Sequence, residues 1–141
     1  MTTLDDPYRL IRTAPPVDAY LRLRAGSGLT PCRQDQAEAA VKGGWAAVHL
    51  VESATGLPVA MGRVIGDGGW YFHVLDMAVL PDHQRRGLGD RILTELLETI
   101  GRQAPPGAWV TLLADAPGRR LYHRHGFRET APDSLGMGLT L

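Results

Sequence analysis

The residues Gln84–Asp90, which read QRRGLGD, combine two arginines with two glycines directly before a segment with a helical apolar pattern. The first N–H groups of a helix lack backbone partners and carry a partial positive charge, so a helix start can bind an anion. Glycines let a ligand approach the backbone closely, and Arg85 and Arg86 add charged donors for phosphate oxygens. The pattern predicts a diphosphate-binding turn; the alternative is that its glycines only turn the chain.

Two better-known phosphate-binding motifs do not fit this turn. A P-loop needs Lys-Ser or Lys-Thr after its last glycine, and Gly89 is followed by Asp90 and Arg91. The dinucleotide-binding fingerprint G-x-G-x-x-G needs a third glycine where the chain has Ile92. The residue pattern therefore excludes a P-loop and argues against a dinucleotide site.

The segments on either side of the turn carry alternating strand and helix patterns. An apolar stripe at the 3.6-residue period predicts a helix over residues 88–102; it consists of Leu88, Ile92, Leu93, Leu96, Leu97 and Ile100. Strands are expected over residues 8–13, 45–53, 58–65, 70–80, 109–114 and 135–141, and further helices over 16–25, 34–42 and 117–123. This order predicts an α/β domain around one mixed sheet.

Two motifs in this arrangement resemble the signatures of a known superfamily. V-x-P-x-x-Q-R-R-G-L-G over Val79–Gly89 resembles the acetyl-CoA signature of the GNAT N-acetyltransferases. L-Y-H-R-H-G-F over Leu121–Phe127 resembles the second signature of the same superfamily, in the expected order and with a strand between the two. The resemblance covers nearly the whole chain. It implies a single N-acetyltransferase domain over residues 1–141, with a mixed, mostly antiparallel sheet that splays between two strands and has flanking helices.

The resemblance also implies where acetyl-CoA would bind. Its pantetheine arm would lie between the strand before the turn and the strand after the helix, bonded to the backbone of Met77–Val79, where one N–H would polarise the thioester carbonyl. The diphosphate would rest on the backbone of Arg85–Asp90. Asp115 stands where many members carry an asparagine, and Asp90 places a carboxylate beside the phosphates. The implied cofactor-binding residues are Met77, Ala78, Val79, Gln84, Arg85, Arg86, Gly87, Leu88, Gly89, Asp90 and Asp115.

Acetyl transfer from a thioester to an amine needs a deprotonated amine, a polarised carbonyl and a proton for the leaving thiolate. The resemblance implies that the Tyr122 hydroxyl points at the CoA sulfur, and a phenol with a pKa of about 10 can protonate a thiolate. The alternative for Tyr122 is a packing role between its short helix and the sheet. Cys32 is expected to be a bystander, because direct transfer requires no covalent enzyme intermediate.

His73 is the expected base, because several members of the resembled family place a catalytic Glu or His six residues before the valine of the first signature. A histidine with an ordinary pKa of about 6.5 is mostly neutral at pH 7 and can take the proton of the amine, directly or through water. The base could instead be Asp76 or a water molecule. In the alternative without a catalytic role, His73 is a partly buried histidine hydrogen-bonded to the backbone, and Asp76 forms a structural ion pair. In a regular strand, Asp76 lies on the face opposite to that of Tyr71, His73, Leu75, Met77 and Val79.

The acceptor is expected to be a primary amine of a small molecule, since the chain is compact and has no added acidic or basic arm. The alternatives are an amine of a protein or peptide, and a non-catalytic module that only binds acyl-CoA. A pocket for an aromatic or apolar amine is suggested by Trp70, Tyr71 and Phe72, with Tyr20 and Trp45. Aromatic residues in a strand can equally belong to the core. Acyl donors other than acetyl-CoA are left open.

Composition and charge narrow the class of protein further. Lys and Arg together number 15, as do Asp and Glu, so neither nucleic acid nor an anionic membrane is an expected partner. No apolar run reaches the roughly 20 residues of a membrane span, and the N-terminal MTTLDDPYRL is acidic where a signal peptide is basic. A single cysteine fits a reducing compartment. We expect a cytoplasmic protein that uses no metal, and the sequence leaves a homodimer open.

Overall fold

The computed structural model describes residues 6–141, so residues 1–5, part of the segment that bears on a signal peptide, lie outside the described residues. Its sheet is mixed and mostly antiparallel, as predicted: neighbouring strands run antiparallel except the last two, which are parallel. The five strands follow one another across the sheet in chain order: β1 (Tyr8–Ile11), β2 (Ala46–Glu52), β3 (Pro58–Gly66), β4 (Tyr71–Val79) and β5 (Trp109–Thr111).

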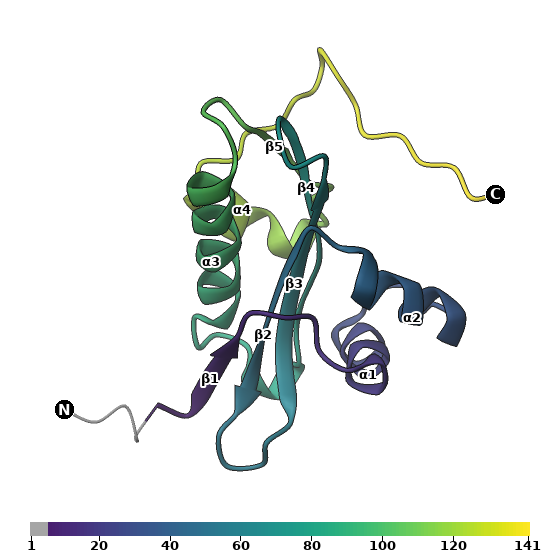
Figure 1. Cartoon of the computed structure of the whole chain (residues 1–141), viewed down its shortest axis with the longest axis vertical. Helices are drawn as coiled ribbons and strands as arrows, with labels where there is room; N and C mark the ends of the chain where they lie inside the picture. The colour runs from purple at the N-terminus through teal and green to yellow at the C-terminus, as the bar shows by residue number, and fades with distance from the viewer. Residues whose placement is uncertain (1–5) are drawn as a thin grey trace. The chain divides into compact units, whose positions relative to one another are not determined.

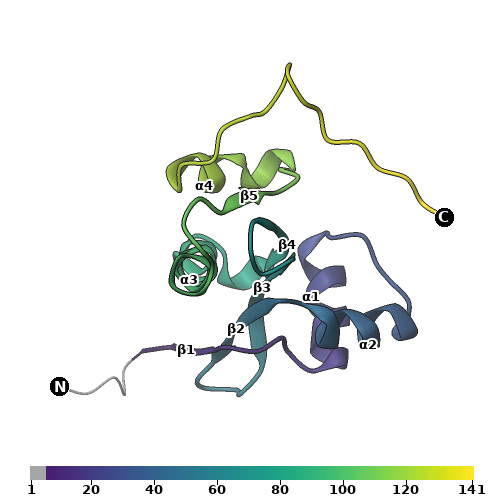
Figure 2. The same cartoon turned by 45° about the horizontal axis from the view of Figure 1, so that its top comes forward.

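Helices cover both faces of this sheet, as Figure 1 and Figure 2 show from two directions. α3 (Leu88–Gln103) packs on one face, against β2 and β3, and α1 (Val17–Ser27) and α2 (Gln34–Gly43) lie on the other. The predicted stripe of α3 is what it buries, because residues at a 3.6 period line one side of a helix: Leu88, Ile92, Leu93, Leu96 and Ile100. None of the described helices is long and apolar enough to cross a membrane.

The first helix is longer than the sequence predicts, because Gly26 does not end it. α1 continues to Ser27 and ends at Gly28, whose φ of 89° is the left-handed conformation that glycine adopts without strain. A Cβ atom at Gly26 would lie 2.8 Å from Cδ2 of Leu80. The missing side chain at Gly26 therefore lets α1 approach the chain just after β4.

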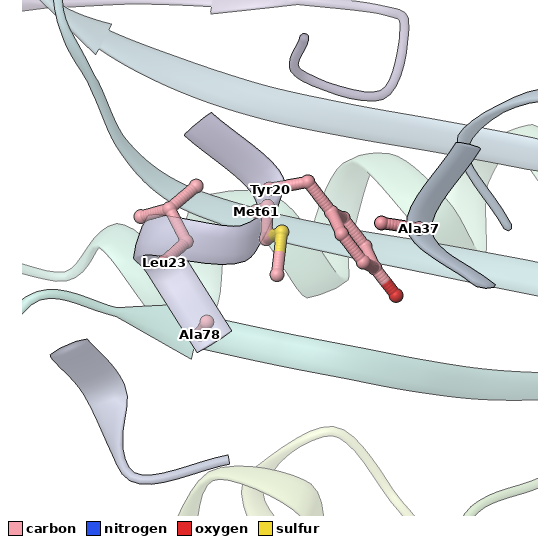
Figure 3. Close-up of a cluster of buried hydrophobic side chains, with 5 residues drawn as sticks. All are labelled: Tyr20, Leu23, Ala37, Met61 and Ala78. Carbon is pink, nitrogen blue, oxygen red and sulfur yellow. The ribbon is translucent and has the colours of Figure 1, made fainter. Parts of the chain in front are cut away.

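A compact apolar cluster joins α1 and α2 to the sheet (Figure 3). It consists of Tyr20, Leu23, Ala37, Met61 and Ala78, all almost completely buried. Cys32 packs against this cluster as a half-buried free thiol, in a packing position that fits the bystander role expected for it.

β4 contains a bulge that shifts its register against β3. Met61 pairs with Ala78, whereas Arg63 pairs with Leu75, so β4 carries one residue more than β3 over this interval. Asp76 lies within the bulge at φ 57°, a left-handed conformation that Asp tolerates better than most residues do. An extra residue of this kind is the defining feature of a β-bulge.

The bulge overturns the prediction that Asp76 lies opposite His73. The side chain of Asp76 is on the α1 face, where Arg63 donates to it, and Leu75 shares that face as the Cα partner of Arg63. Alternation along the strand then places His73 on the α1 face too. Met77 lies on the α3 face, since a Cβ atom at Gly62 under α3 would sit 2.7 Å from its sulfur.

The Asp76 carboxylate is the centre of a buried ionic cluster between α1, β3 and β4. It accepts hydrogen bonds from Arg24 (2.5 Å), Arg63 (2.8 Å) and the Tyr20 hydroxyl (2.5 Å). Burial pushes the Asp76 pKa upward, but these hydrogen bonds and the two guanidinium charges outweigh it, so its pKa lies below the ordinary value. A carboxylate held ionised by two cations fits the structural ion pair, and is poorly suited to take a proton.

The described chain divides into two compact units, a larger one that ends at Thr111 and a smaller one, Leu112–Leu141. The smaller unit contains a 3₁₀ turn (Ala116–Gly118) and α4 (Arg119–Arg124), close to the expected helix over 117–123. β5 ends at Thr111 and not at residue 114, and the strand predicted over 135–141 is wrong. Residues 135–141 are all exposed and carry two glycines, which weaken a strand that has no buried face.

Replacing the Asp76 carboxylate tests how much the ionic cluster stabilises the fold. Asp76→Asn keeps the size and the tolerance for a positive φ but leaves two buried guanidiniums without a counter-charge, so we expect the free energy of unfolding to fall by about 3 kcal/mol. Because the Asp76 pKa is lowered in the fold, the difference from wild type should be full above the unfolded pKa of about 3.9 and shrink as pH falls below it. Urea denaturation across this pH range measures both effects.

The matched control for Asp76→Asn is Asp35→Asn, since Arg33 and Asp35 form an ion pair in which both side chains are 71% exposed. That variant should change the free energy of unfolding by less than about 1 kcal/mol. Equal effects of the two substitutions would contradict a stabilising role for the buried cluster.

Candidate active site

The turn before α3 has the local form that the sequence predicts. A 3₁₀ turn over Pro81–His83 leads into the loop, and α3 begins at Leu88 after Gly87 as its N-cap residue. Gly87 adopts φ 77°, so any other residue would strain the loop here. Glycine has no side chain to cap the helix, and the N–H groups of the first turn are thus placed to bind an anionic ligand.

The two arginines of this turn have different roles in the structure. Arg86 donates to the Tyr8 hydroxyl at 2.9 Å, and that hydroxyl lies 2.7 Å from Nδ1 of His83, so β1 is tied to the turn. Gln84 closes the loop by donating from Nε2 to the Val79 carbonyl at 3.1 Å. Arg85 is exposed, with φ 63°, and has no hydrogen-bond partner among the described residues. Arg85 is therefore the more available of the two arginines for a phosphate group.

The parallel pairing of β4 with β5 is short and ends before the bulge in β4. The paired residues run from Tyr71 with Trp109 to His73 with Thr111. β4 continues from there to Val79, and no described residue of β5 lies beside this part. Met77–Val79, the segment expected to bond the pantetheine arm, therefore belongs to the part of β4 that is paired on one side only.

His73 lies at the end of that parallel pairing. Its Nδ1 is 2.8 Å from the Thr111 hydroxyl, and its half-buried ring has a pKa lowered by burial. The ring lines an open pocket of about 250 Å³, whose walls also include Ile65, Tyr71 and Thr111 together with Gly66 and Phe72. None of these lining residues carries a formal charge other than a protonated His73. The pocket can therefore accept an apolar group beside an uncharged imidazole.

Three of the aromatic residues proposed for the pocket, Tyr20, Trp45 and Trp70, do not line it. Tyr20 is 2% exposed and donates its hydroxyl to Asp76, so it belongs to the α1 cluster. The ring of Trp45 packs edge to face on Phe72, with 4.8 Å between ring centroids. Tyr71 does line the pocket. The ring of Trp70 packs on the ring of Tyr71, with 4.7 Å between centroids, and Trp70 is 61% exposed.

Tyr122 and Asp115 belong to the smaller unit. Tyr122 lies on α4, and its ring packs edge to face on Phe127 at 6.1 Å between centroids. Burial, and then the negative charge of Asp115, raise the pKa of Tyr122, which keeps its phenol protonated at neutral pH. The carboxyl group of Asp115 is itself on an exposed residue. Among residues 6–141, no group of three or more His, Cys, Asp or Glu side chains could hold a metal ion.

Sequence patterns missed two features of this site. Thr111 was not among the expected site residues, because its contact with His73 depends on the β4–β5 register, which no local signal encodes. Arg24 and Arg63 were missed as partners of Asp76 because they lie far from it in sequence. The expected turn residues needed no such long-range information, since they are consecutive.

Comparison with known proteins identifies the family. Residues 44–129 match the sequence profile of the acetyltransferase (GNAT) domain, which is more than half of the chain. A probable acetyltransferase of unknown function from meticillin-resistant Staphylococcus aureus has a solved structure that is similar to this chain. It is 32% identical, with a TM-score of 0.89 over 95% of this chain and 99% of the other. The chain belongs to the GNAT acetyltransferases and is an acyltransferase of a family that uses acetyl-CoA.

More distant structures share the fold while acting on different acceptors. Glucosamine-6-phosphate N-acetyltransferase from Arabidopsis thaliana is 13% identical, with a TM-score of 0.72 over 94% of this chain and 97% of the other. The ribosomal-protein-S18-alanine N-acetyltransferase from Escherichia coli is 19% identical, with a TM-score of 0.73 over 88% and 79%. At these identities the likeness shows the fold alone. No protein of curated function matches the sequence.

Proposed function

We propose that this acetyltransferase moves the acetyl group of acetyl-CoA directly to a primary amine of a small, largely apolar molecule, and that its two units act as one domain over residues 1–141. The observation that carries the proposal is the arrangement along β4. A histidine beside an uncharged pocket lies at one end of the strand, and a glycine turn that begins a helix follows the other end. The single cysteine supports the cytoplasm as the compartment.

The proposed binding mode for acetyl-CoA uses the backbone more than side chains. The diphosphate rests on Arg85–Asp90, where α3 begins and Gly87 leaves the backbone accessible. The pantetheine amides bond to Met77–Val79 beyond the last β4–β5 pair, and one N–H of this segment polarises the thioester carbonyl. Gln84 shapes the loop through Val79, and Asp115 contributes from the smaller unit.

The proposed chemistry assigns one proton transfer to each of two side chains. Nε2 of His73 takes a proton from the bound ammonium group, and the neutral amine nitrogen attacks the carbonyl carbon. The new C–N bond forms as the C–S bond breaks, and Tyr122 gives its proton to the thiolate of CoA. The proton that the amide nitrogen then sheds returns Tyr122 to its phenol form, and His73 releases its proton to water. A raised Tyr122 pKa and a lowered His73 pKa support these roles, since one group must hold a proton and the other must lack it.

The proposed acceptor class follows from what the pocket lacks. A phosphorylated amine would require cationic side chains, and a polyamine would require carboxylates, whereas the lining offers Ile65, Tyr71, Phe72 and the imidazole. A volume of about 250 Å³ suits a small ligand or one end of a longer one. An apolar amine with a single amino group is the acceptor that this lining supports best.

Binding of acetyl-CoA at the α3 turn predicts a specific role for Arg85. Arg85→Ala removes a charged donor to phosphate, so we expect the Kd of acetyl-CoA to rise about ten-fold, with a larger effect at low salt. Isothermal titration calorimetry measures this directly. Arg33→Ala is the control, because Arg33 is an equally charged, exposed residue at the start of α2. If both variants lost affinity for acetyl-CoA to a similar extent, the loss would be an effect of net charge. That result would contradict a phosphate-binding role for Arg85.

Loss of the Tyr122 hydroxyl should affect the chemical step and not the binding of the cofactor. Tyr122→Phe is expected to lower kcat by about 10²- to 10⁴-fold, the usual contribution of a general acid, with the Kd of acetyl-CoA nearly unchanged. Steady-state kinetics and calorimetry on the same preparation separate the two quantities. A normal kcat in Tyr122→Phe would leave the tyrosine with only its packing contact to Phe127.

A panel of acceptors tests the substrate class. Release of CoA, followed with a thiol-detecting reagent, should be fastest with arylalkyl and other apolar primary amines. It should be slow with amino sugar phosphates and polyamines, because their extra charges find no partner in the pocket lining. Peptides with free N-termini and lysines belong in the same panel. If peptides outperform every small amine, the acceptor is a protein and the proposed class is wrong.

A further inference from the structure

We propose that Thr111 is a positioning residue that fixes His73 in the tautomer protonated at Nδ1, so that Nε2 keeps its lone pair for the proton of the amine. This inference rests on the proposed role of His73 as the base. It concerns a contact between two strands, and Thr111 itself needs no contact with acceptor or cofactor. A neutral imidazole carries its proton on one nitrogen only, so the partner of Nδ1 decides whether Nε2 can act as a base.

The proposed tautomer follows from the two partners of the Thr111 hydroxyl. Its Oγ1 donates to the Phe72 carbonyl at 3.4 Å and lies 2.8 Å from Nδ1 of His73. A hydroxyl has one proton and a carbonyl can only accept. With that proton directed to Phe72, the short contact is satisfied when Nδ1–H of His73 donates to Oγ1. Nε2 is then unprotonated, and it has no hydrogen-bond partner among the described residues.

The position of the pair in the sheet keeps this geometry fixed. His73 and Thr111 are Cα partners at the last position of the parallel pairing between β4 and β5. Thr111 is β-branched and therefore has few χ1 rotamers available. The backbone register thus holds Oγ1 beside Nδ1, and His73 lines the pocket together with Ile65 and Tyr71.

Apart from Thr111, the imidazole has no hydrogen-bond partner among the described residues. The pocket lining contains no carboxylate, and Asp76, which shares the face of His73, is already bonded to Arg24, Arg63 and Tyr20. A hydroxyl partner orients the ring without the negative charge that would raise its basicity. This agrees with the His73 pKa, which burial lowers, and keeps the imidazole neutral and ready to accept a proton at pH 7.

A second histidine supplies an internal reference for the test. Nδ1 of His49 lies 2.6 Å from the Thr13 carbonyl, which can only accept, so His49 is protonated at Nδ1. Its pKa is lowered by burial, and it is therefore neutral under the same conditions as His73. The ring nitrogens of both residues can be followed in one long-range ¹H–¹⁵N correlation spectrum of the ¹⁵N-labelled protein, with His73→Gln and His49→Gln used for assignment.

The spectroscopic test compares Thr111→Val with Thr111→Ser near pH 7.5. In the wild type, His73 should show the Nδ1-protonated pattern of His49. Thr111→Val, which keeps the shape and removes the hydroxyl, should move His73 toward the Nε2-protonated form, whereas Thr111→Ser and the His49 signals should stay as in the wild type. An Nε2-protonated His73 in the wild type, or an unchanged pattern in Thr111→Val, would overturn the proposal.

Kinetics separate this inference from the proposed function. Thr111→Val should lower kcat/KM for the amine by about three- to ten-fold, with the Kd of acetyl-CoA unchanged, and Thr111→Ser should restore it. His73→Gln should lose about 10²- to 10⁴-fold and flatten the acidic limb of the kcat/KM profile. If His73→Gln retains the activity and the acidic limb, the assignment of His73 as base fails, even where the spectrum shows the tautomer that Thr111 fixes.

Discussion

The carboxylate of Asp76 is buried between two guanidinium groups, and the geometry of the sheet depends on that arrangement. A charge removed from water is stable only with partners close by, and here Arg24 comes from α1, Arg63 from β3 and Asp76 from β4. The three charges can meet only because the bulge turns Asp76 toward α1. The ionic cluster therefore fixes the position of the bulge as well as the packing of α1 on the sheet.

The bulge divides β4 into two parts that have different neighbours. The part before it pairs with β5 and holds His73 on the α1 face, beside the pocket. The part after it, Met77–Val79, leads directly into the turn before α3. A regular strand would place His73 and Met77 on the same face. With one extra residue, Met77 packs toward α3, while the backbone of its segment continues toward the glycine turn.

Local patterns in the sequence predicted the parts of the molecule that depend on neighbouring residues. The stripe of α3 follows from the helical period, and the start of that helix follows from Gly87. No local signal predicts the bulge at Asp76. An Asp residue in such a segment is equally compatible with an exposed loop, an ion pair or an active site. The same holds for Thr111, whose contact depends on the parallel register. The prediction of a strand over 135–141 was wrong for a related reason. Alternation of apolar and polar residues indicates a strand only where a neighbouring strand is available to pair with it.

The features that identify the family are not the ones proposed to select the acceptor. Proteins with this fold acetylate glucosamine 6-phosphate in one case and the alanine of a ribosomal protein in another, so the sheet and the α3 turn carry no information about the amine. In this chain, Arg24 and Arg63 both donate hydrogen bonds to Asp76 and therefore have a structural role. The residues that line the pocket beside His73 carry no formal charge other than that of a protonated imidazole. The proposed selectivity for an uncharged, apolar body with a single amino group rests on this absence of charge from the pocket lining.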